Sequence, residues 1–220
     1  MVALLCENCT KGTVMESRIS KGELTRGRIL DLAEEAVLQK GFAATSIDEL
    51  IAAAEITKSG FFYHFKDKAH LAKEMFQRYL EREDEIFEEL EGRADELSDD
   101  PLHSTLILIK LFAEMFENIP KNHPGCLVAV YCYQHQLFND EIRELNVASL
   151  LRWRNVYRTR LDRIIEKYPV ENVDLEALSD LALTFVEGGI ILSKTLDDRE
   201  LLPRQMLLFR DYIRRIFSPV

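Results

Sequence analysis

TSIDELIAAAEITKSGFFYHFKDK, residues 45–68, is the stretch of this 220-residue sequence that decides its fold. Its first half repeats apolar residues at the i, i+3, i+4 and i+7 spacing of one helix face, at Ile47, Leu50, Ile51 and Ala54. Two capping boxes could start this helix, Thr45 with Asp48 or Ser46 with Glu49. A short amphipathic helix is therefore predicted here.

The second half of the stretch predicts another short helix after a tight turn. Polar residues open it at Thr57, Lys58 and Ser59, and Phe61, Phe62 and Phe65 give it an inward apolar side. Two short helices joined by about three or four residues form the helix-turn-helix unit, whose second helix reads base edges in DNA. The stretch thus indicates a DNA-binding head.

The flanking sequence extends this unit in both directions. A helix is predicted over Leu24–Gly41, where the glycine is a C-terminal stop. A long fourth helix begins at Asp67 or Lys68, and we expect it to fray near Gly92 and to give way to a polar linker ending at Pro101. Its ~25 residues would span ~37 Å at the helical rise, enough to carry a movement between two parts of the molecule.

The remainder reads as further helices, so the fold class is all-α, with about nine helices. The stretch from His123 to Tyr133 is nearly all apolar and predicts a buried helix. The other helical segments expected in this part are Leu102–Ile119, Asp140–Tyr168, Asp174–Leu196 and Pro203–Phe217. We expect a flexible tail over 1–20, a three-helix DNA-binding domain over 21–70, and a ligand-binding and dimerisation domain over 71–220.

Composition supports a globular protein with a sizeable core, because 47% of residues are hydrophobic and 30% are charged. The formal net charge is −10, but residues 18–70 hold eight Lys/Arg and eight Asp/Glu, so the acidity lies outside the predicted reading segment. The apolar run Leu106–Phe112 is too short to cross a bilayer. No signal peptide is apparent, and four cysteines suggest a reducing cytoplasm.

Residues 24–71 resemble the DNA-binding head of the tetracycline-repressor-like (TetR/AcrR) family of bacterial regulators. The matching strings are ILDLAEEAVLQKGFAATSIDEL (29–50) and IAAAEITKSGFFYHFKDKAHL (51–71). Phe62 departs from the pattern, since the family more often has tyrosine there. The resemblance implies a homodimeric regulator, most often a repressor, that binds a palindromic operator and is released by a small molecule. It places the dimer interface on the last two helices, about Asp174–Leu196 and Pro203–Phe217, where Gly188 and Gly189 would let backbones approach.

By position, the resemblance implies two sets of DNA contacts. Thr57, Lys58, Ser59 and Gly60 would face the major groove, where Lys58 can donate to guanine O6 or N7. The residues at positions that usually bind phosphate are Thr45, Ser46, Tyr63, His64 and Lys68.

A ligand pocket is expected in the C-terminal part, built from apolar residues with a few polar groups. Such a lining, with Gln134, His135 and Tyr157 as its polar members, suits a lipophilic or aromatic effector. The candidate lining residues are Phe112, Met115, Phe116, Tyr131, His135, Trp153, Tyr157 and Phe185.

Two other interpretations stay open at this point. Cys126 and Cys132, near His123 and His135, could form a thiol or metal sensor. Alternatively, the helix-turn-helix could be purely architectural in a helical ligand-binding protein or enzyme. The pair Cys6 and Cys9 forms a CxxC without a second ligand pair nearby. No catalytic motif is present, so we expect no enzyme activity, no cofactor and no metal. Either Met1 or Met15 could be the start of the protein.

Overall fold

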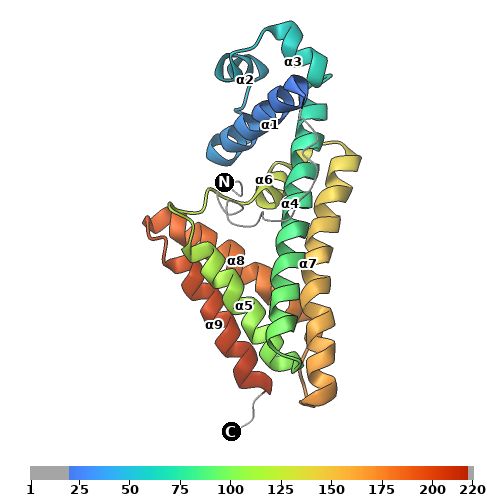
Figure 1. The fold of residues 1–220 in the computed structure, drawn as a ribbon, viewed down its shortest axis with the longest axis vertical. Helices are drawn as coiled ribbons and strands as arrows, with labels where there is room; N and C mark the ends of the chain where they lie inside the picture. The colour runs from blue at the N-terminus through green and yellow to red at the C-terminus, as the bar shows by residue number, and fades with distance from the viewer. Residues whose placement is uncertain (1–19, 218–220) are drawn as a thin grey trace.

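A computed structural model describes residues 20–217, and these contain nine α-helices, one short 3₁₀ helix and no β-strand. The helices form a small head above a larger body (Figure 1). Their bounds are α1 Lys21–Lys40, α2 Ile47–Ala54, α3 Lys58–His64, α4 Lys68–Leu97, α5 Pro101–Glu117, α6 Leu127–Tyr133, η2 His135–Leu137, α7 Asp140–Lys167, α8 Leu175–Leu196 and α9 Leu201–Phe217. None of the described helices is long and apolar enough to cross a membrane.

The head consists of α1, α2 and α3, and each begins at a capping hydroxyl. Ser20 and Glu23 form a reciprocal capping box at α1. The Ser46 hydroxyl accepts a hydrogen bond from the Glu49 backbone N–H at α2, so Ser46 is the cap there. The Thr57 hydroxyl does the same for the Gly60 N–H at α3. These caps fix where the two short helices of the helix-turn-helix begin.

The core of the head is made of apolar residues from all three helices and from the start of α4. Phe61 and Phe65 of the α3 region are fully buried, as the sequence predicts, and α1 contributes Ile29, Ala33 and Val37. Burying such side chains contributes about 1.5–3 kcal/mol each for the large ones. Phe62 departs from the expected inward side of α3, because 44% of it is exposed.

Helix α4 is longer than expected and runs straight through Gly92 to Leu97. Ala94 is completely buried there, and the Asp95 carboxylate accepts hydrogen bonds from Ser104 and from Arg160. This packing outweighs the weak helix propensity of glycine, which costs about 1 kcal/mol. The polar linker expected before Pro101 shrinks to three residues, 98–100.

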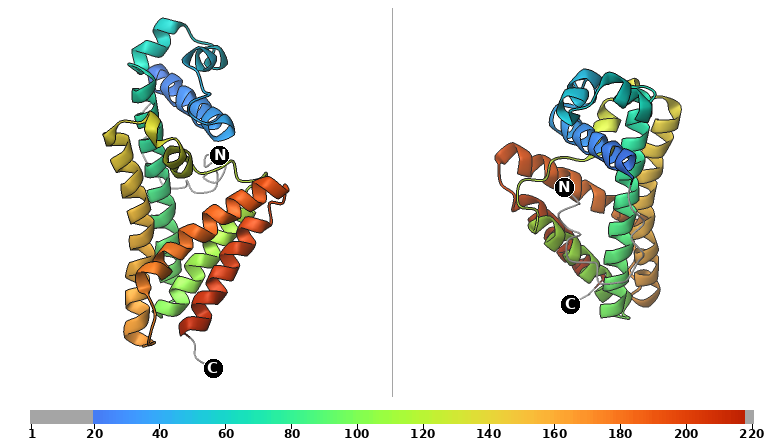
Figure 2. Two further views of the ribbon diagram at one scale, coloured as in Figure 1. Left: turned by 180° about the vertical axis from the view of Figure 1, so that it is seen from behind. Right: turned by 45° about the horizontal axis from the view of Figure 1, so that its top comes forward.

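The body contains two groups of helices (Figures 1 and 2). One group is α4 and α7, and the other is α5, α8 and α9. Helix α9 packs against α5 and α8, and α8 also packs against α7, which runs alongside α4. The buried Arg160 guanidinium of α7 joins α4 to α5, through Glu91 at 3.1 Å, Asp95 at 3.0 Å and the Ser104 hydroxyl at 3.0 Å. This arginine is 4% exposed, and its charge is matched by two carboxylates.

Two expectations for the body need correction. The stretch His123–Cys126 is not helical, and α6 exposes Cys132 and Tyr133, so it is not buried all round. The close approach at Gly189 lies within the subunit, because a Cβ there would be 2.8 Å from Leu202 Cδ1 and 3.1 Å from Leu202 Cα of α9. Gly188 has open space at its Cβ position.

Candidate nucleic-acid interface and ligand cavity

The outer face of the helix-turn-helix is formed by the first turn of α3. Thr57, Lys58 and Ser59 are exposed, and the Thr57 and Ser59 hydroxyls lie 3.0 Å apart. Tyr63, one turn further on, is 83% exposed. Because Phe61 and Phe65 are buried on the opposite face, α3 is held with this polar side outward. The arrangement offers hydroxyl, ammonium and phenol donors on one convex ridge.

The charges around this ridge are distributed unevenly. Arg26 is paired with Glu74, and Lys40 with Glu49, so much of the positive charge of the head is neutralised. Within residues 20–217, Lys58 makes no ion pair with any carboxylate. The ammonium group of Lys58 is therefore available to bind an anionic partner.

The residues expected at phosphate positions do not behave alike. Ser46 is exposed at the start of α2, and His64 is half-buried with its ring 5.0 Å from that of Tyr63. Thr45 is only 2% exposed and donates its hydroxyl hydrogen bond to the Gly41 carbonyl at 3.0 Å. Its side chain supports the α1–α2 turn and faces away from solvent, which corrects the expectation for this residue.

Lys68 also differs from the expectation of a free phosphate donor. Its ammonium donates to the Phe42 carbonyl at 2.7 Å and lies 4.3 Å from the centre of the Phe42 ring. Partial burial lowers the pKa of this ammonium. Lys68 thus holds the start of α4 against the segment that joins α1 to α2.

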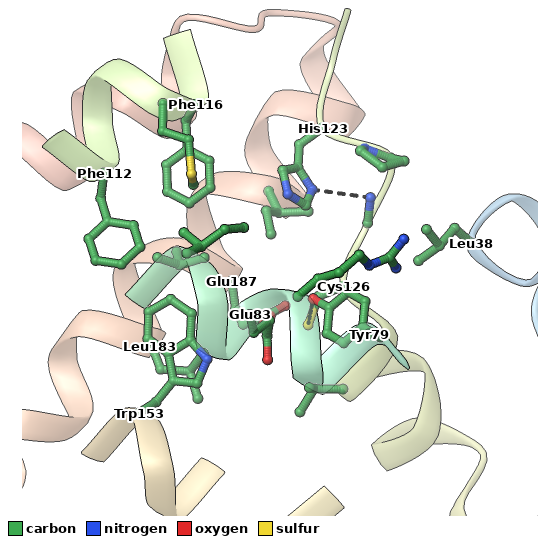
Figure 3. A pocket seen from close by; sticks show the side chains of 18 of the residues that line it. Leu38, Tyr79, Glu83, Phe112, Phe116, His123, Cys126, Trp153, Leu183 and Glu187 are labelled. Carbon is green, nitrogen blue, oxygen red and sulfur yellow. Dashed lines mark hydrogen bonds between the residues drawn. The ribbon is translucent and has the colours of Figure 1, made fainter. Parts of the chain in front are cut away.

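A cavity of about 110 Å³ lies in the upper body, enclosed by α1, α4, α5, α7, α8 and the segment before α6 (Figure 3). Four of the residues expected at a pocket line it: Phe112, Met115, Phe116 and Trp153. The three aromatic rings form one wall, with the Phe112 and Trp153 ring centres 5.9 Å apart. The aromatic lining predicted from the sequence is thus present in part.

The other four expected lining residues lie elsewhere. Tyr131 is stacked on Phe76 and Phe138 and donates to the Ala72 carbonyl at 2.8 Å. Tyr157 and Phe185 both pack against Phe209 of α9. His135 is exposed in η2. Tyr131, Tyr157 and Phe185 therefore pack in or against the hydrophobic core, whereas His135 does not.

Sequence reasoning missed the polar part of the lining, which comes from α1, α4, α8 and the segment before α6. Its members are Glu34, Tyr79, Arg82, Glu83, His123, Cys126 and Glu187. Glu83 belongs to a helix with many carboxylates, which predict a solvent-exposed face. Glu187 is the one acidic residue in an otherwise apolar stretch of its helix. That isolation of Glu187 was the one signal available in the sequence.

Burial governs the titration of these groups. Burial raises the pKa of the Glu83 carboxyl to about 7, although the neighbouring Tyr79 and Trp153 side chains favour its ionised form. Burial also raises the pKa of Glu187. Burial lowers the pKa of His123 to about 4, assisted by the nearby Lys194 charge, so this imidazole is neutral at pH 7.

The two cysteines of the described chain stand in different surroundings. Cys126 is buried beside Tyr79, whose hydroxyl oxygen is 3.8 Å from its sulfur, whereas Cys132 is exposed. Burial raises the pKa of the Cys126 thiol well above its usual value, and a thiol that stays protonated is a poor nucleophile and metal ligand. Among residues 20–217, no cluster of three or more potential metal ligands occurs. The pair Cys6 and Cys9 lies outside the described residues.

The cavity is in direct contact with the head. Glu34 and Leu38 of α1 line it, and Arg82 of α4 is paired with Glu34. Gln134, at the end of α6 and outside the cavity lining, also joins the body to the head, since its side-chain oxygen accepts from the backbone N–H groups of Phe42 at 2.9 Å and Ala43 at 3.2 Å. A change in the shape of the cavity would therefore act on α1 without an intermediate element.

Comparisons with known proteins agree with this arrangement. The family model described as bacterial regulatory proteins, tetR family, matches residues 29–75. The chain is 40% identical over 53 residues to the HTH-type transcriptional regulator AcrR of Shigella flexneri, which covers 24% of this chain and 25% of that protein. It is 22% identical over 180 residues to the HTH-type transcriptional repressor DhaR of Mycobacterium sp. strain GP1, covering 80% and 85%.

The likeness in fold extends over nearly the whole molecule. A TetR transcriptional regulator from Chloroflexus aurantiacus superposes with a TM-score of 0.73 at 24% identity, covering 89% of this chain and 96% of that one. At the level of sequence the match is more local, since the chain spans 25%, 42% and 53% of three of the curated relatives that it matches. The family model therefore identifies a tetR-family helix-turn-helix within residues 29–75, and the described chain as a whole shares the all-helical fold of the solved TetR regulator.

Proposed function

We propose that the protein is a homodimeric transcriptional regulator, most simply a repressor, which binds a palindromic operator and releases it when a small molecule enters the cavity. The observation that carries the DNA-binding role is the exposed first turn of α3, set on the buried Phe61 and Phe65, with a lysine, Lys58, that pairs with no carboxylate within residues 20–217. Residues 21–70 would bind DNA, and residues 71–220 would bind the ligand and form the dimer.

In this proposal some residues of the head contact DNA bases and others contact the phosphate backbone. Thr57, Lys58, Ser59 and Gly60 enter the major groove, with Lys58 donating to guanine O6 or N7. Ser46, Tyr63 and His64 bind phosphates on either side, which positions the helix without selecting sequence. Thr45 and Lys68 contribute by holding the turn and the start of α4 in place.

The test of DNA binding needs no knowledge of the operator. The full-length protein is titrated into fluorescent random-sequence duplex DNA at several salt concentrations. We expect binding at low salt, and an affinity that falls by about 10³-fold or more between about 50 and 200 mM salt, as six or more phosphate contacts would produce. If the helix-turn-helix is only architectural, the protein will show no binding at any salt concentration, and that result would overturn the proposal.

The dimer is proposed to form through α8 and α9. Exposed apolar side chains gather on the outer faces of both helices, at Ile191, Leu192 and Leu196 of α8 and at Leu208 and Tyr212 of α9. Gly188 lies on the same face of α8 as Ile191 and Leu192 and has no atom within 4 Å of its Cβ position, which leaves room for a partner helix. Pairing these faces across a two-fold axis would bury them. It would also hold the two heads at a separation that lets each bind one half-site of the DNA.

Replacing Ile191 and Leu208 together with arginine is expected to convert the dimer into a monomer. Each side chain is 55% exposed in the single chain, and placing like charges opposite each other at a two-fold interface costs several kcal/mol. Sedimentation velocity measures the outcome. Leu97→Arg, at a residue that is 61% exposed at the far end of α4, is the matched control and should leave the dimer intact. A dimer that survives the double replacement would place the interface elsewhere.

Ligand release follows from the contact between the cavity and α1. A ligand shifts DNA affinity only if it binds the two conformations of the protein differently, however tightly it binds either one. Leu38 and Glu34 line the cavity from α1, which packs against α2, and α2 in turn packs against α3. A ligand that displaces Leu38 would therefore favour head positions that no longer match the half-site spacing.

A further inference from the structure

The cavity combines an apolar wall with acidic groups that lack a cation. The carboxyls of Glu83 from α4 and Glu187 from α8 point toward its centre (Figure 3). Neither forms an ion pair with any residue in 20–217. Arg82 is the one cationic side chain of the lining, and it is paired with Glu34. The lining thus holds three carboxyls against one guanidinium.

The neighbours of Glu83 and Glu187 do not neutralise them. Glu83 faces the Tyr79 hydroxyl and the Trp153 side chain, with Asp84 and Glu187 as further acids. Glu187 faces the Cys126 thiol. The neutral His123 lies near Lys194, whose ammonium donates to the Pro124 carbonyl at 2.5 Å. Half-buried carboxyls without a cation or a full set of donors are costly, so a protein that keeps two of them beside a cavity gains from a partner that enters it.

We infer that the effector is a compact organic cation, an aromatic amine or ammonium compound whose charged group sits between Glu83 and Glu187 and whose ring packs on Phe112, Phe116 and Trp153. This inference rests on the proposed function, because it names the chemical class of the molecule that enters the regulatory cavity. It narrows the lipophilic or aromatic effector expected from the sequence to one that carries positive charge.

Two physical terms favour such a ligand. A cation between two carboxylates in a site with few water molecules gains far more Coulomb energy than it would in bulk water. The ring of the ligand packs on Trp153 and the phenylalanines, which adds aromatic contacts to the burial of its apolar surface. A cavity of about 150 Å³ with apolar walls holds benzene, so this one, with about 110 Å³, has to widen by side-chain movement to admit an aromatic amine. An anionic ligand would meet two carboxyls and is disfavoured.

The test compares a cation with a neutral molecule of the same shape. Benzylamine, which is protonated at pH 8, and benzyl alcohol are titrated into the full-length protein by isothermal calorimetry. We expect benzylamine to bind at least about tenfold more tightly. The preference should disappear in Glu83→Gln and in Glu187→Gln, because glutamine keeps the shape and removes the charge. Glu81→Gln, at an exposed carboxyl two residues away on α4, should retain it.

The pH dependence provides a second readout. Because Glu83, with a pKa of about 7, must be ionised to attract the cation, the affinity for benzylamine should fall about fivefold between pH 7 and pH 6, while that for benzyl alcohol stays constant. Equal binding of the two probes, or tighter binding of benzyl alcohol, would overturn the inference and leave the proposed effector cavity standing. If neither probe binds, the inference and the proposed effector cavity are both overturned. The DNA-binding role is tested separately, by the titration with random-sequence DNA.

Discussion

Lys58→Glu is expected to weaken binding to an operator-like duplex by about 100-fold or more. A lysine that donates to guanine contributes about 1–3 kcal/mol of discrimination, and a dimer places two copies of it in the groove. Glutamate removes both contacts and brings a negative charge to the phosphates. The residue is exposed and makes no ion pair within residues 20–217, so the change should not affect folding. Fluorescence anisotropy with a labelled duplex measures the effect.

The control for this charge reversal is Lys121→Glu, on an exposed position of the segment between α5 and α6. It changes the net charge by the same amount but lies in the body. We expect its DNA affinity to remain within about threefold of that of the unaltered protein. If both variants lose affinity equally, the effect belongs to the overall charge, and α3 is not the reading element.

Glu83→Gln is expected to stabilise the free protein by about 3 kcal/mol at pH 9, and by little at pH 4. Burial holds the folded-state pKa of Glu83 at about 7, compared with 4.5 for an ordinary glutamate. The folded state therefore binds this proton more tightly than the unfolded state does. Its contribution to stability is full below about pH 4.5 and is lost as the pH rises through about 7. Glutamine cannot ionise, so the variant does not lose this stability. Each pKa unit corresponds to about 1.4 kcal/mol, and the difference between 4.5 and about 7 therefore gives about 3 kcal/mol.

Urea unfolding at pH 4, 7 and 9, followed by circular dichroism, measures the difference. Glu81→Gln is again the matched control, because its carboxyl is exposed on the same helix, and its unfolding free energy should follow that of the unaltered protein at every pH. A Glu83→Gln difference that is the same at pH 4 and pH 9 would contradict the account of Glu83 as a buried carboxyl without a cation.

The head could be predicted from its sequence because its determinants are local. Ser46 and Thr57 cap helices through residues three positions away, and Phe61 and Phe65 follow the spacing of one helix face. The sequence does not show that the Thr45 side chain turns inward, because Thr45 and Ser46 are adjacent residues that both carry a hydroxyl. Only the path of the α1–α2 turn decides which of them faces the Gly41 carbonyl.

The body was harder to predict because its interior is assembled from distant segments. Glu83 and Glu187 are far apart in the sequence and meet only where α4 passes α8. Tyr131, Tyr157 and Phe185 share the apolar character of Phe112 and Trp153, yet they fill the core. Helical spacing separates an inner face from an outer one. It does not indicate which part of the inner face is left empty.

The central claim is that α3, carried by a symmetric dimer, reads a specific DNA sequence. The most direct measurement is selection of tightly bound duplexes from a pool of randomised DNA by the full-length protein, followed by sequencing. The account predicts enrichment of a palindrome with two half-sites about one helical turn apart, and a motif that becomes less defined when Lys58→Ala is used. An enriched sequence without two-fold symmetry, one unaffected by Lys58→Ala, or no enrichment at all would contradict it.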